Sequence, residues 1–230
     1  MGGLAGAHLG IISRLLSQAG HPRGRVGRFV AREMNRKHAP LRSWVLSGVP
    51  EYGGVERILD LGCGGGGAIR RLASLAPEAE IHGVDSSADS IRVATRVNAD
   101  LIAAGRVFVR QGTVSDLPYE SGHFDLALAT DSHYFWPDLP ADLAEVQRVL
   151  KDGGVLLLGG AAYFGGRLDG LIRRFAAAGD MNCQTLPELE EVVARAGYTD
   201  VATREDWRKG WFCVVGTKPA GGCDMASPAT

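Results

Sequence analysis

The sequence predicts an α/β protein built around a mostly parallel β-sheet with helices on both faces. Three observations indicate this class. After residue 54 short apolar segments alternate with helical segments, one apolar segment runs directly into the glycine-rich run 62–67, and two apolar segments near the end form a hairpin. Such alternation is typical of parallel strands joined by crossover helices. Hydrophobic residues make up 45% and charged residues 22% of the 230 residues, the ordinary balance of a globular protein.

The first 50 residues are expected to form a helical N-terminal cap. Apolar periodicity predicts helices over residues 8–18, 25–37 and 40–47, after which glycines and a proline end the helical segment. Residues 1–50 hold eight Arg or Lys side chains against one Glu, so this segment carries a charge of +7 and the remainder −8. A basic segment can face an anionic substrate, RNA or a membrane surface, or it can simply be a solvated helix face.

The strand and helix segments that follow can be placed in order. Strands are expected over residues 57–61, 80–84, 107–111, 124–129 and 155–159, and helices near residues 68–75, 87–103, 139–150 and 187–196. The last two strands, over residues 200–206 and 211–217, are joined by the short connection 207–210. A connection of this length favours an antiparallel hairpin. The expected sheet therefore has seven strands, of which the last is antiparallel.

The composition of the sequence indicates how the chain divides into domains and where in the cell the protein is expected. We expect a cap over residues 1–50, one cofactor-binding domain over 51–218 and a flexible tail over 219–230. Four cysteines without paired spacing indicate neither a metal site nor a disulfide framework, which favours the cytoplasm. No apolar run approaches the roughly 20 residues of a membrane span, so no stable membrane insertion is expected. The net charge of −1 gives no general attraction to nucleic acid, and we leave a homodimer open.

The run 58–67 predicts a ligand-binding turn between a strand and a helix. Glycine is needed where the backbone turns sharply and must approach a ligand without a Cβ. Gly62, Gly64 and Gly67 also match the G-x-G-x-x-G pattern of dinucleotide sites, which by itself is weak evidence. Asp60 distinguishes a dinucleotide from a ligand that carries a positive charge. A carboxylate beside the turn repels a pyrophosphate and attracts an ammonium or a sulfonium. Asp85, at the end of the next strand, can accept both hydroxyls of a ribose or cap the following helix.

Four segments carry a resemblance to a known family. The segments ILDLGCGGG (58–66), IHGVDSS (81–87), RQGTVSDLPYESGHFDLALA (110–129) and VLKDGGVLLL (149–158) resemble, in order and spacing, those of class I S-adenosylmethionine (SAM)-dependent methyltransferases of the ubiquinone/menaquinone type. The resemblance covers residues 57 to about 218. It implies a Rossmann-like fold with the seven-stranded sheet described above, SAM as cofactor and S-adenosylhomocysteine as product.

The resemblance also implies the residues that bind the cofactor. Asp60, Gly62 and Gly64 would border the methionine moiety and Asp85 would hold the ribose. Family members often have Gly-Asp-Ala where this chain has Gly112-Thr113-Val114, so Thr113 replaces the usual acidic partner of the adenine amine. The complete expected set of cofactor-binding residues is Asp60, Gly62, Cys63, Gly64, Asp85, Ser86, Gly112, Thr113, Val114 and Thr130. Cys63 is expected to be a small packing residue of the glycine turn rather than a nucleophile.

Two segments are expected to form the acceptor side of the site. Residues 129–138, after the fourth strand, supply His133 as a candidate base, with Tyr134 and Trp136 as aromatic walls, or they only pack against the cofactor and cap the next helix. The segment before the first strand contributes His38 and Asn35. Tyr163, after the fifth strand, is a further candidate for the substrate cavity. We therefore expect catalytic residues among His133, Tyr134 and His38, substrate contacts from Asn35, Trp136 and Tyr163, and no metal.

These expectations favour an enzyme that transfers the methyl group of SAM to a small-molecule acceptor such as a metabolite, a natural product or a quinone-like ring. One alternative is an NAD-type dehydrogenase on the same glycine turn. Another is a SAM-binding module without turnover. The sequence does not distinguish methylation at oxygen, nitrogen, carbon or sulfur.

Overall fold

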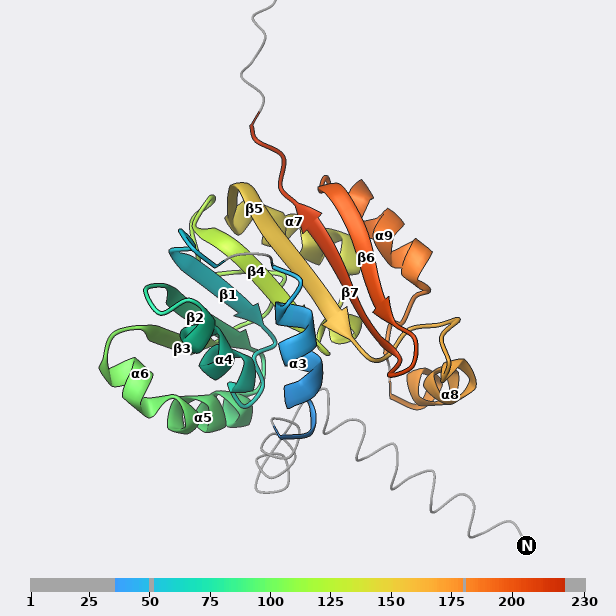
Figure 1. Ribbon diagram of the computed structural model, residues 1–230, viewed down its shortest axis with the longest axis horizontal. Coiled ribbons are helices and arrows are strands. Elements are labelled where there is room, and N and C mark those ends of the chain that lie inside the picture. Colours follow the sequence, from blue (N-terminus) through green and yellow to red (C-terminus); the bar gives the residue numbers. More distant parts are fainter. Residues whose placement is uncertain (1–35, 50–51, 180, 222–230) are drawn as a thin grey trace, which may run out of the picture.

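A seven-stranded sheet forms the centre of the computed structural model, which describes residues 36–49, 52–179 and 181–221 (Figure 1). The strands are β1 (Arg57–Leu61), β2 (Glu80–Asp85), β3 (Val107–Gln111), β4 (Phe124–Thr130), β5 (Leu150–Gly160), β6 (Thr199–Asp206) and β7 (Trp211–Thr217). Their spatial order is β3-β2-β1-β4-β5-β7-β6. The first five strands pair in parallel, and β7 is antiparallel to both β5 and β6. The predicted sheet, with its antiparallel last strand, is confirmed.

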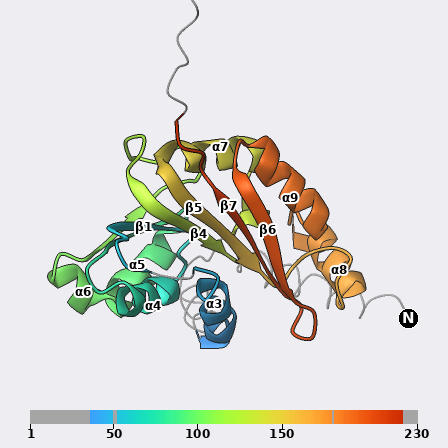
Figure 2. The same cartoon turned by 45° about the horizontal axis from the view of Figure 1, so that its top comes forward.

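Helices cover both faces of the sheet (Figures 1 and 2). One face packs against α3 (Ala39–Leu46), α4 (Gly67–Leu75) and α5 (Ala88–Val97), which α6 (Ala99–Ala103) follows. The other face packs against α7 (Leu139–Val149) and α9 (Leu186–Arg195). The short 3₁₀-helix η1 (His133–Phe135) follows β4, and α8 (Asp169–Gly179) follows β5. Because both faces are covered, the central strands are almost wholly apolar, as buried parallel strands require.

The structure corrects the single helix expected over residues 87–103. Asn98 separates α5 from α6, and its side-chain amide donates to the carbonyl oxygens of Ala94 (3.0 Å) and Gly66 (3.1 Å). An asparagine that binds backbone groups in this way competes with continuation of the helix. The same side chain ties α5 to the turn before α4.

The structure also corrects the start of the fifth strand. β5 begins at Leu150, where it pairs with Phe124, rather than at residue 155. Beyond β7, the Lys218 ammonium donates to the Leu150 carbonyl oxygen (2.8 Å), and the Gly221 amide donates to Asp152 (2.8 Å). The described chain is thus hydrogen-bonded as far as Gly221, and residues 222–230, most of the expected flexible tail, lie outside the described residues.

The described part of the N-terminal cap belongs to the helical layer on the sheet. Leu41, Val45 and Leu46 of α3 are buried against β5, β7 and α4. Arg36 and Lys37, the end of the helix expected over residues 25–37, are helical, whereas the rest of that helix and the one expected over residues 8–18 lie outside the described residues. Among the described helices, none has the length and apolar character needed to cross a bilayer.

Gly159 permits the close approach of α3 to the sheet. A Cβ at this position would lie 2.4 Å from Cγ2 of Val45. We expect Gly159→Ala to lower the free energy of unfolding by about 1–3 kcal/mol, because the added methyl group overpacks this contact. Urea unfolding measures the change, with Gly170→Ala as control, since Gly170 has open space around it on α8. Equal stability of the two variants would contradict this account of α3.

Candidate active site

A pocket lies at the carboxyl ends of β1, β2 and β4, with a cavity volume of about 240 Å³. Here the strand order reverses, because β1 has β2 on one side and β4 on the other. Ligands of open α/β sheets bind at such a point. The turn after β1, the ends of β2 and β4, and the start of α3 all line this pocket.

The glycine turn is shaped by its neighbours and by its backbone conformation. The amides of Gly62 and Cys63 donate to the carbonyl oxygen of Val84, which closes the turn over the end of β2. Gly62 has a φ of 70°, and a Cβ there would lie 2.5 Å from Cβ of Ser132. Gly64 also has a positive φ, of 53°, but a Cβ there would meet no protein atom within 4 Å. Gly62 is therefore required by packing, while Gly64 leaves the backbone open to a ligand in the pocket.

Asp60 places a buried carboxylate at the floor of the pocket. Its side chain is only 2% exposed, and Oδ2 has no hydrogen-bond partner among the described residues. Burial raises the pKa of Asp60 to about 7, with the Arg42 charge opposing this shift and Asp85 adding to it. A buried unpaired carboxylate is costly unless a cation compensates it. This orphaned oxygen fits the ammonium of the predicted methionine moiety.

The residues expected to hold the nucleoside also surround the pocket. Asp85 accepts hydrogen bonds from the amides of Gly64 (2.8 Å) and Ser87 (2.8 Å), which fix its carboxylate in the wall of the pocket. Thr130 adds a buried hydroxyl that has no hydrogen-bond partner in the described structure. All ten predicted cofactor residues line this pocket, including Ser86, Gly112, Thr113 and Val114. The polar groups that line the pocket therefore fit the predicted cofactor.

Arg42 is a pocket residue that the sequence interpretation did not select. Its guanidinium lines the pocket from α3. Burial lowers the pKa of Arg42, while the charges of Asp60 and Asp131 raise it, so the three groups lie within electrostatic reach of one another. Arg42 comes four residues after His38, so the helical spacing places both on one face. That spacing could have predicted Arg42 once His38 was chosen.

His38 and Asp131 form a hydrogen-bonded pair at the pocket. Nδ1 of His38 lies 2.5 Å from Oδ2 of Asp131, and both residues line the pocket. The His38 side chain is 35% exposed and that of Asp131 8%. The other oxygen of Asp131 accepts from the Tyr134 hydroxyl (2.5 Å) and from the Ala161 amide (3.1 Å). Asp131 was not predicted, although it lies within the segment 129–138 that was.

The environment keeps Asp131 ionised. Burial alone would raise its pKa, but the hydrogen bonds and charge of His38, with the bonds from Tyr134 and Ala161, outweigh burial and lower the pKa. Asp131 has a positive φ of 55°, a conformation that Asp tolerates better than most residues. An ionised Asp131 holds the proton of His38 on Nδ1, which leaves Nε2 of His38 as the proton acceptor.

The structure does not support the catalytic roles expected of His133 and Tyr134. His133 is 2% exposed, lies edge-on to Phe212 and is not among the residues that line the pocket. Burial lowers the pKa of His133 to about 4, with Asp131 opposing the shift. Tyr134 is buried outside the pocket lining, and burial followed by the Asp131 charge raises its pKa, so it remains a neutral donor. Tyr134 is thus a partner that positions Asp131.

The expected substrate residues are only partly brought together. Trp136 lines the pocket beside Phe135 and Pro137. Tyr163 does not line it, because its hydroxyl donates to Glu205 (2.5 Å) and its ring packs edge-on against Phe212. Asn35 lies outside the described residues. Cys63 is buried in the pocket wall, and burial raises the pKa of its thiol, which is consistent with packing rather than nucleophilic attack.

Comparison with known proteins identifies a domain over the centre of the chain. Residues 58–154 match the model of a family described as "Methyltransferase domain". The chain is 37% identical over 102 residues to a fatty-acid O-methyltransferase of Mycolicibacterium smegmatis. The aligned residues cover 44% of this chain and 36% of the relative. It is 33% identical over 128 residues to a phthiotriol/phenolphthiotriol dimycocerosates methyltransferase of Mycobacterium ulcerans, covering 56% and 45% of the two chains.

A solved structure with a similar fold is that of geranyl diphosphate C-methyltransferase from Streptomyces coelicolor, in complex with Mg²⁺, geranyl diphosphate and S-adenosyl-L-homocysteine. It aligns with a TM-score of 0.69 and 16% identity over 86% of each chain. The chain spans between about a third and a half of the length of the two curated relatives. The family match over residues 58–154 includes most of the residues that line the pocket.

Proposed function

We propose that this chain, which carries a methyltransferase domain with the class I fold, transfers the methyl group of SAM to an oxygen atom of a small organic acceptor. The observation that carries the proposal is the unpartnered carboxylate oxygen of Asp60 on the floor of the pocket. It lies beside the glycine turn, with Asp85 on the next strand end. This set of groups suits an amino acid joined to a nucleoside better than it suits a pyrophosphate.

Different residues of the pocket would bind different parts of the cofactor. Asp60 would accept from the ammonium of the methionine moiety, and Arg42, which lines the same pocket, would face the carboxylate of that moiety. Asp85 would accept from the ribose, and the segment Gly112–Val114 would face the adenine. When bound, SAM supplies a methyl group activated by a sulfonium.

The protein's own chemical contribution is removal of a proton from the acceptor. Nε2 of His38 takes the proton of an acceptor hydroxyl, and the ionised Asp131 stabilises the imidazolium that forms. Asp131 also keeps the imidazole in the orientation and tautomer that the step requires. The proton therefore ends on Nε2 of His38 and passes to solvent, to which this half-buried side chain is exposed.

Apolar groups on the pocket wall favour an apolar acceptor. Phe135, Trp136 and Pro137 line the side of the pocket formed by the segment after β4. One relative is named a fatty-acid O-methyltransferase, whose acceptor combines an apolar chain with an oxygen. We therefore propose an acceptor with a hydroxyl or carboxyl group on an apolar body. A cytoplasmic location, a homodimer and the absence of a nucleic-acid partner stay predictions.

The dehydrogenase alternative has no support. Its glycine pattern is present, but the family match over residues 58–154 is to a methyltransferase domain. The inserted antiparallel β7 also departs from the all-parallel order of dinucleotide-binding folds. A SAM-binding module without turnover remains the second candidate, and the His38–Asp131 pair argues against it.

The experiment that tests the proposal is transfer of radiolabel from methyl-labelled SAM to a panel of acceptors. A medium-chain fatty acid, a phenol and an aliphatic alcohol represent the oxygen acceptors, and an amine and a thiol serve as controls. We expect label in an ester or an ether. Label in the amine or thiol alone would contradict methylation at oxygen, and binding of S-adenosylhomocysteine without transfer to any acceptor would favour the module.

A further inference from the structure

Exposed apolar side chains are concentrated at one place on the described surface. Leu168 is 40% exposed, Leu171 45% and Trp207 52%. They are three of the four large hydrophobic side chains that are exposed in the described parts of the chain; the fourth, Phe108, lies on β3 at the other end of the sheet. Single exposed apolar residues are ordinary, whereas a group of them indicates an interaction surface.

Helix α8 contributes an exposed apolar side chain to this group. None of its described side chains is buried, whereas α7 buries Leu143 and Val146 and α9 buries Leu189 and Val193. Leu171 is exposed and Ile172 is half-buried. The described apolar side chains of this helix therefore face water, as they would on a helix that binds a partner surface.

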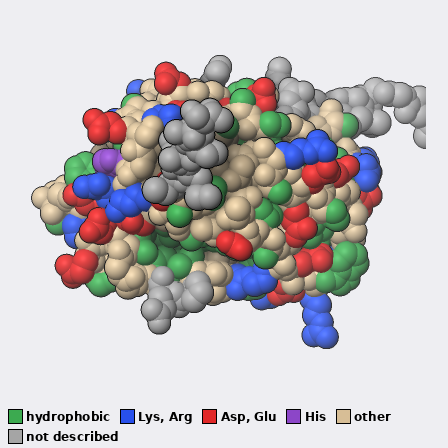
Figure 3. Space-filling model, turned by 90° about the horizontal axis from the view of Figure 1, so that it is seen from above, with side chains coloured by type: hydrophobic (Ala, Val, Ile, Leu, Met, Phe, Trp, Pro, Cys, Tyr) green, Lys and Arg blue, Asp and Glu red, His purple; other side chains and the backbone are tan. Residues whose placement is uncertain are grey.

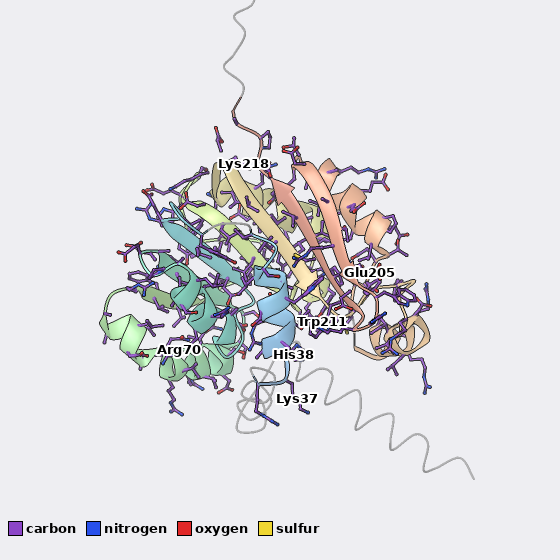
Figure 4. All side chains as sticks on the ribbon, viewed as in Figure 1. Lys37, His38, Arg70, Glu205, Trp211 and Lys218 are labelled. Carbon is purple, nitrogen blue, oxygen red and sulfur yellow. The ribbon has the colours of Figure 1, made fainter. Side chains whose placement is uncertain are left out.

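The hairpin between β6 and β7 brings Trp207 to the same edge. β6 runs in the direction of β5, so its end at Asp206 lies at the carboxyl edge of the sheet, where the pocket also opens. The bond from Tyr163 to Glu205 ties the segment that leads into α8 to the end of β6. Figures 1 and 2 both show α8 beside the tip of this hairpin. In Figure 4, His38, Glu205 and Trp211 lie toward this edge and Lys218 at the opposite one.

Basic side chains accompany the apolar ones. Arg167, Arg174 and Arg208 are exposed and make no ion pair or hydrogen bond with another described residue. Arg173 pairs with Asp169, and Lys209 pairs with Asp206. The three free guanidinium groups therefore give this edge positive charge that no described acidic side chain neutralises.

The opposite edge of the sheet has a different character. There Lys151 pairs with Glu56 and Asp125, and Lys218 pairs with Asp152. Seen from that side, acidic and basic side chains lie interspersed (Figure 3). Among the described residues, exposed apolar groups together with unpaired arginines thus distinguish the carboxyl edge from the opposite edge.

We propose that this rim, defined by Arg167, Leu168, Leu171, Arg174, Trp207 and Arg208, binds an anionic lipid surface. Tryptophan and leucine enter the boundary between head groups and acyl chains, and arginine remains at the head groups with its charge near the phosphates. Charge complementarity favours an anionic bilayer over a second copy of this chain, because two copies would bring the same free arginines together.

This orientation would turn the mouth of the pocket toward the bilayer. A lipid-soluble acceptor could then pass from the membrane to His38 without crossing water. This passage of the acceptor rests on the proposed function, whereas the binding of the rim to lipid does not.

The test is sedimentation of the full chain with phosphatidylcholine vesicles that contain about one third phosphatidylglycerol, compared with pure phosphatidylcholine. Two matched pairs of variants are compared. Leu171→Ser removes an apolar group of the rim, and Phe108→Ser removes the exposed apolar group at the other end of the sheet. Arg174→Glu reverses a rim charge, and Arg96→Glu reverses an exposed charge on α5. Circular dichroism and urea unfolding confirm that each variant folds.

We expect binding to the anionic vesicles only, with partition coefficients lowered about fivefold by Leu171→Ser and about tenfold by Arg174→Glu. Phe108→Ser and Arg96→Glu should bind like the natural sequence. Trp207→Phe should retain binding but lose most of the vesicle-induced blue shift in fluorescence. Affinity for S-adenosylhomocysteine should be the same in every variant, so a failure of lipid binding is distinct from a failure of the proposed function.

Three outcomes would overturn the proposal. No binding to either vesicle excludes a lipid surface. Anionic binding that both rim variants leave unchanged assigns it to another part of the chain, such as the basic residues 1–50. A dimer that Leu171→Ser dissociates, measured by light scattering, would show that a second copy covers the rim.

Discussion

Asp131→Asn is expected to lower the turnover number about 100-fold or more with a hydroxyl acceptor, the usual range for loss of general base catalysis. Asparagine has nearly the same shape and can still accept from Tyr134 and Ala161. Its amide would donate to Nδ1 of His38, which moves the imidazole proton to Nε2 and removes the base. His38→Ala should give a loss of similar size. Initial rates with the best hydroxyl acceptor of the panel measure both effects.

Two comparisons separate proton removal from a structural effect. Tyr134→Phe deletes only one of the hydrogen bonds to Asp131, so a loss of less than about tenfold is expected. A fatty acid is already ionised at neutral pH and has no proton to lose, so Asp131→Asn should barely change its methylation. Equal losses with the fatty acid and with the hydroxyl acceptor would contradict a base and would indicate that the pair only positions the acceptor.

Asp60→Asn is expected to weaken binding of S-adenosylhomocysteine about 30-fold or more at pH 8, since the ligand's ammonium loses its buried carboxylate. The same change should raise the stability of the free protein at pH 8 by about 1–3 kcal/mol, because it removes a buried charge without a hydrogen-bond partner on Oδ2. Calorimetry and urea unfolding measure the two effects. Asp200→Asn, an exposed change of the same kind, should produce neither.

The pH dependence follows from the pKa of Asp60. Folding raises this pKa from its ordinary value of 3.8 to about 7, so the folded state holds the proton more tightly. The contribution of Asp60 to stability therefore falls as the pH rises between these values and is fully unfavourable above pH 7. Binding of an ammonium has the opposite sign, and affinity for S-adenosylhomocysteine should fall as the pH is lowered below 7. Affinity that is constant from pH 8 to 5.5 would show that the ammonium is held elsewhere.

The fold and the cofactor side of the site could be predicted because they depend on local patterns. A strand that enters a glycine turn fixes the position of Asp60 and Gly64, and the next strand end supplies Asp85, so spacing along the chain is enough. Most strand positions followed from continuous apolar segments, but the start of β5 at Leu150 did not, because it depends on pairing with Phe124. The break at Asn98 was missed because it depends on a bond from its side chain to Gly66, which is distant in sequence.

The acceptor side depends on contacts that sequence order does not reveal. His38 and Asp131 are 93 positions apart and meet only because α3 packs on β5 at Gly159, beside the end of β4. His133 was the more obvious candidate, being a histidine after β4, yet the turn of η1 directs it toward Phe212 in the core. The position after β4 therefore pointed to a segment that lines the pocket, although His133 itself lies outside the lining, and the catalytic roles stay predictions. The bond from Tyr163 to Glu205 is likewise a long-range contact.

Calorimetric titration of the protein with S-adenosylhomocysteine, with NADH as the control ligand, tests the central claim most directly. The pocket formed by Asp60, Gly64 and Asp85 predicts one site per chain with micromolar affinity for S-adenosylhomocysteine and no heat of binding with NADH. Binding of NADH alone, or of neither ligand, would contradict the assignment of this pocket to SAM.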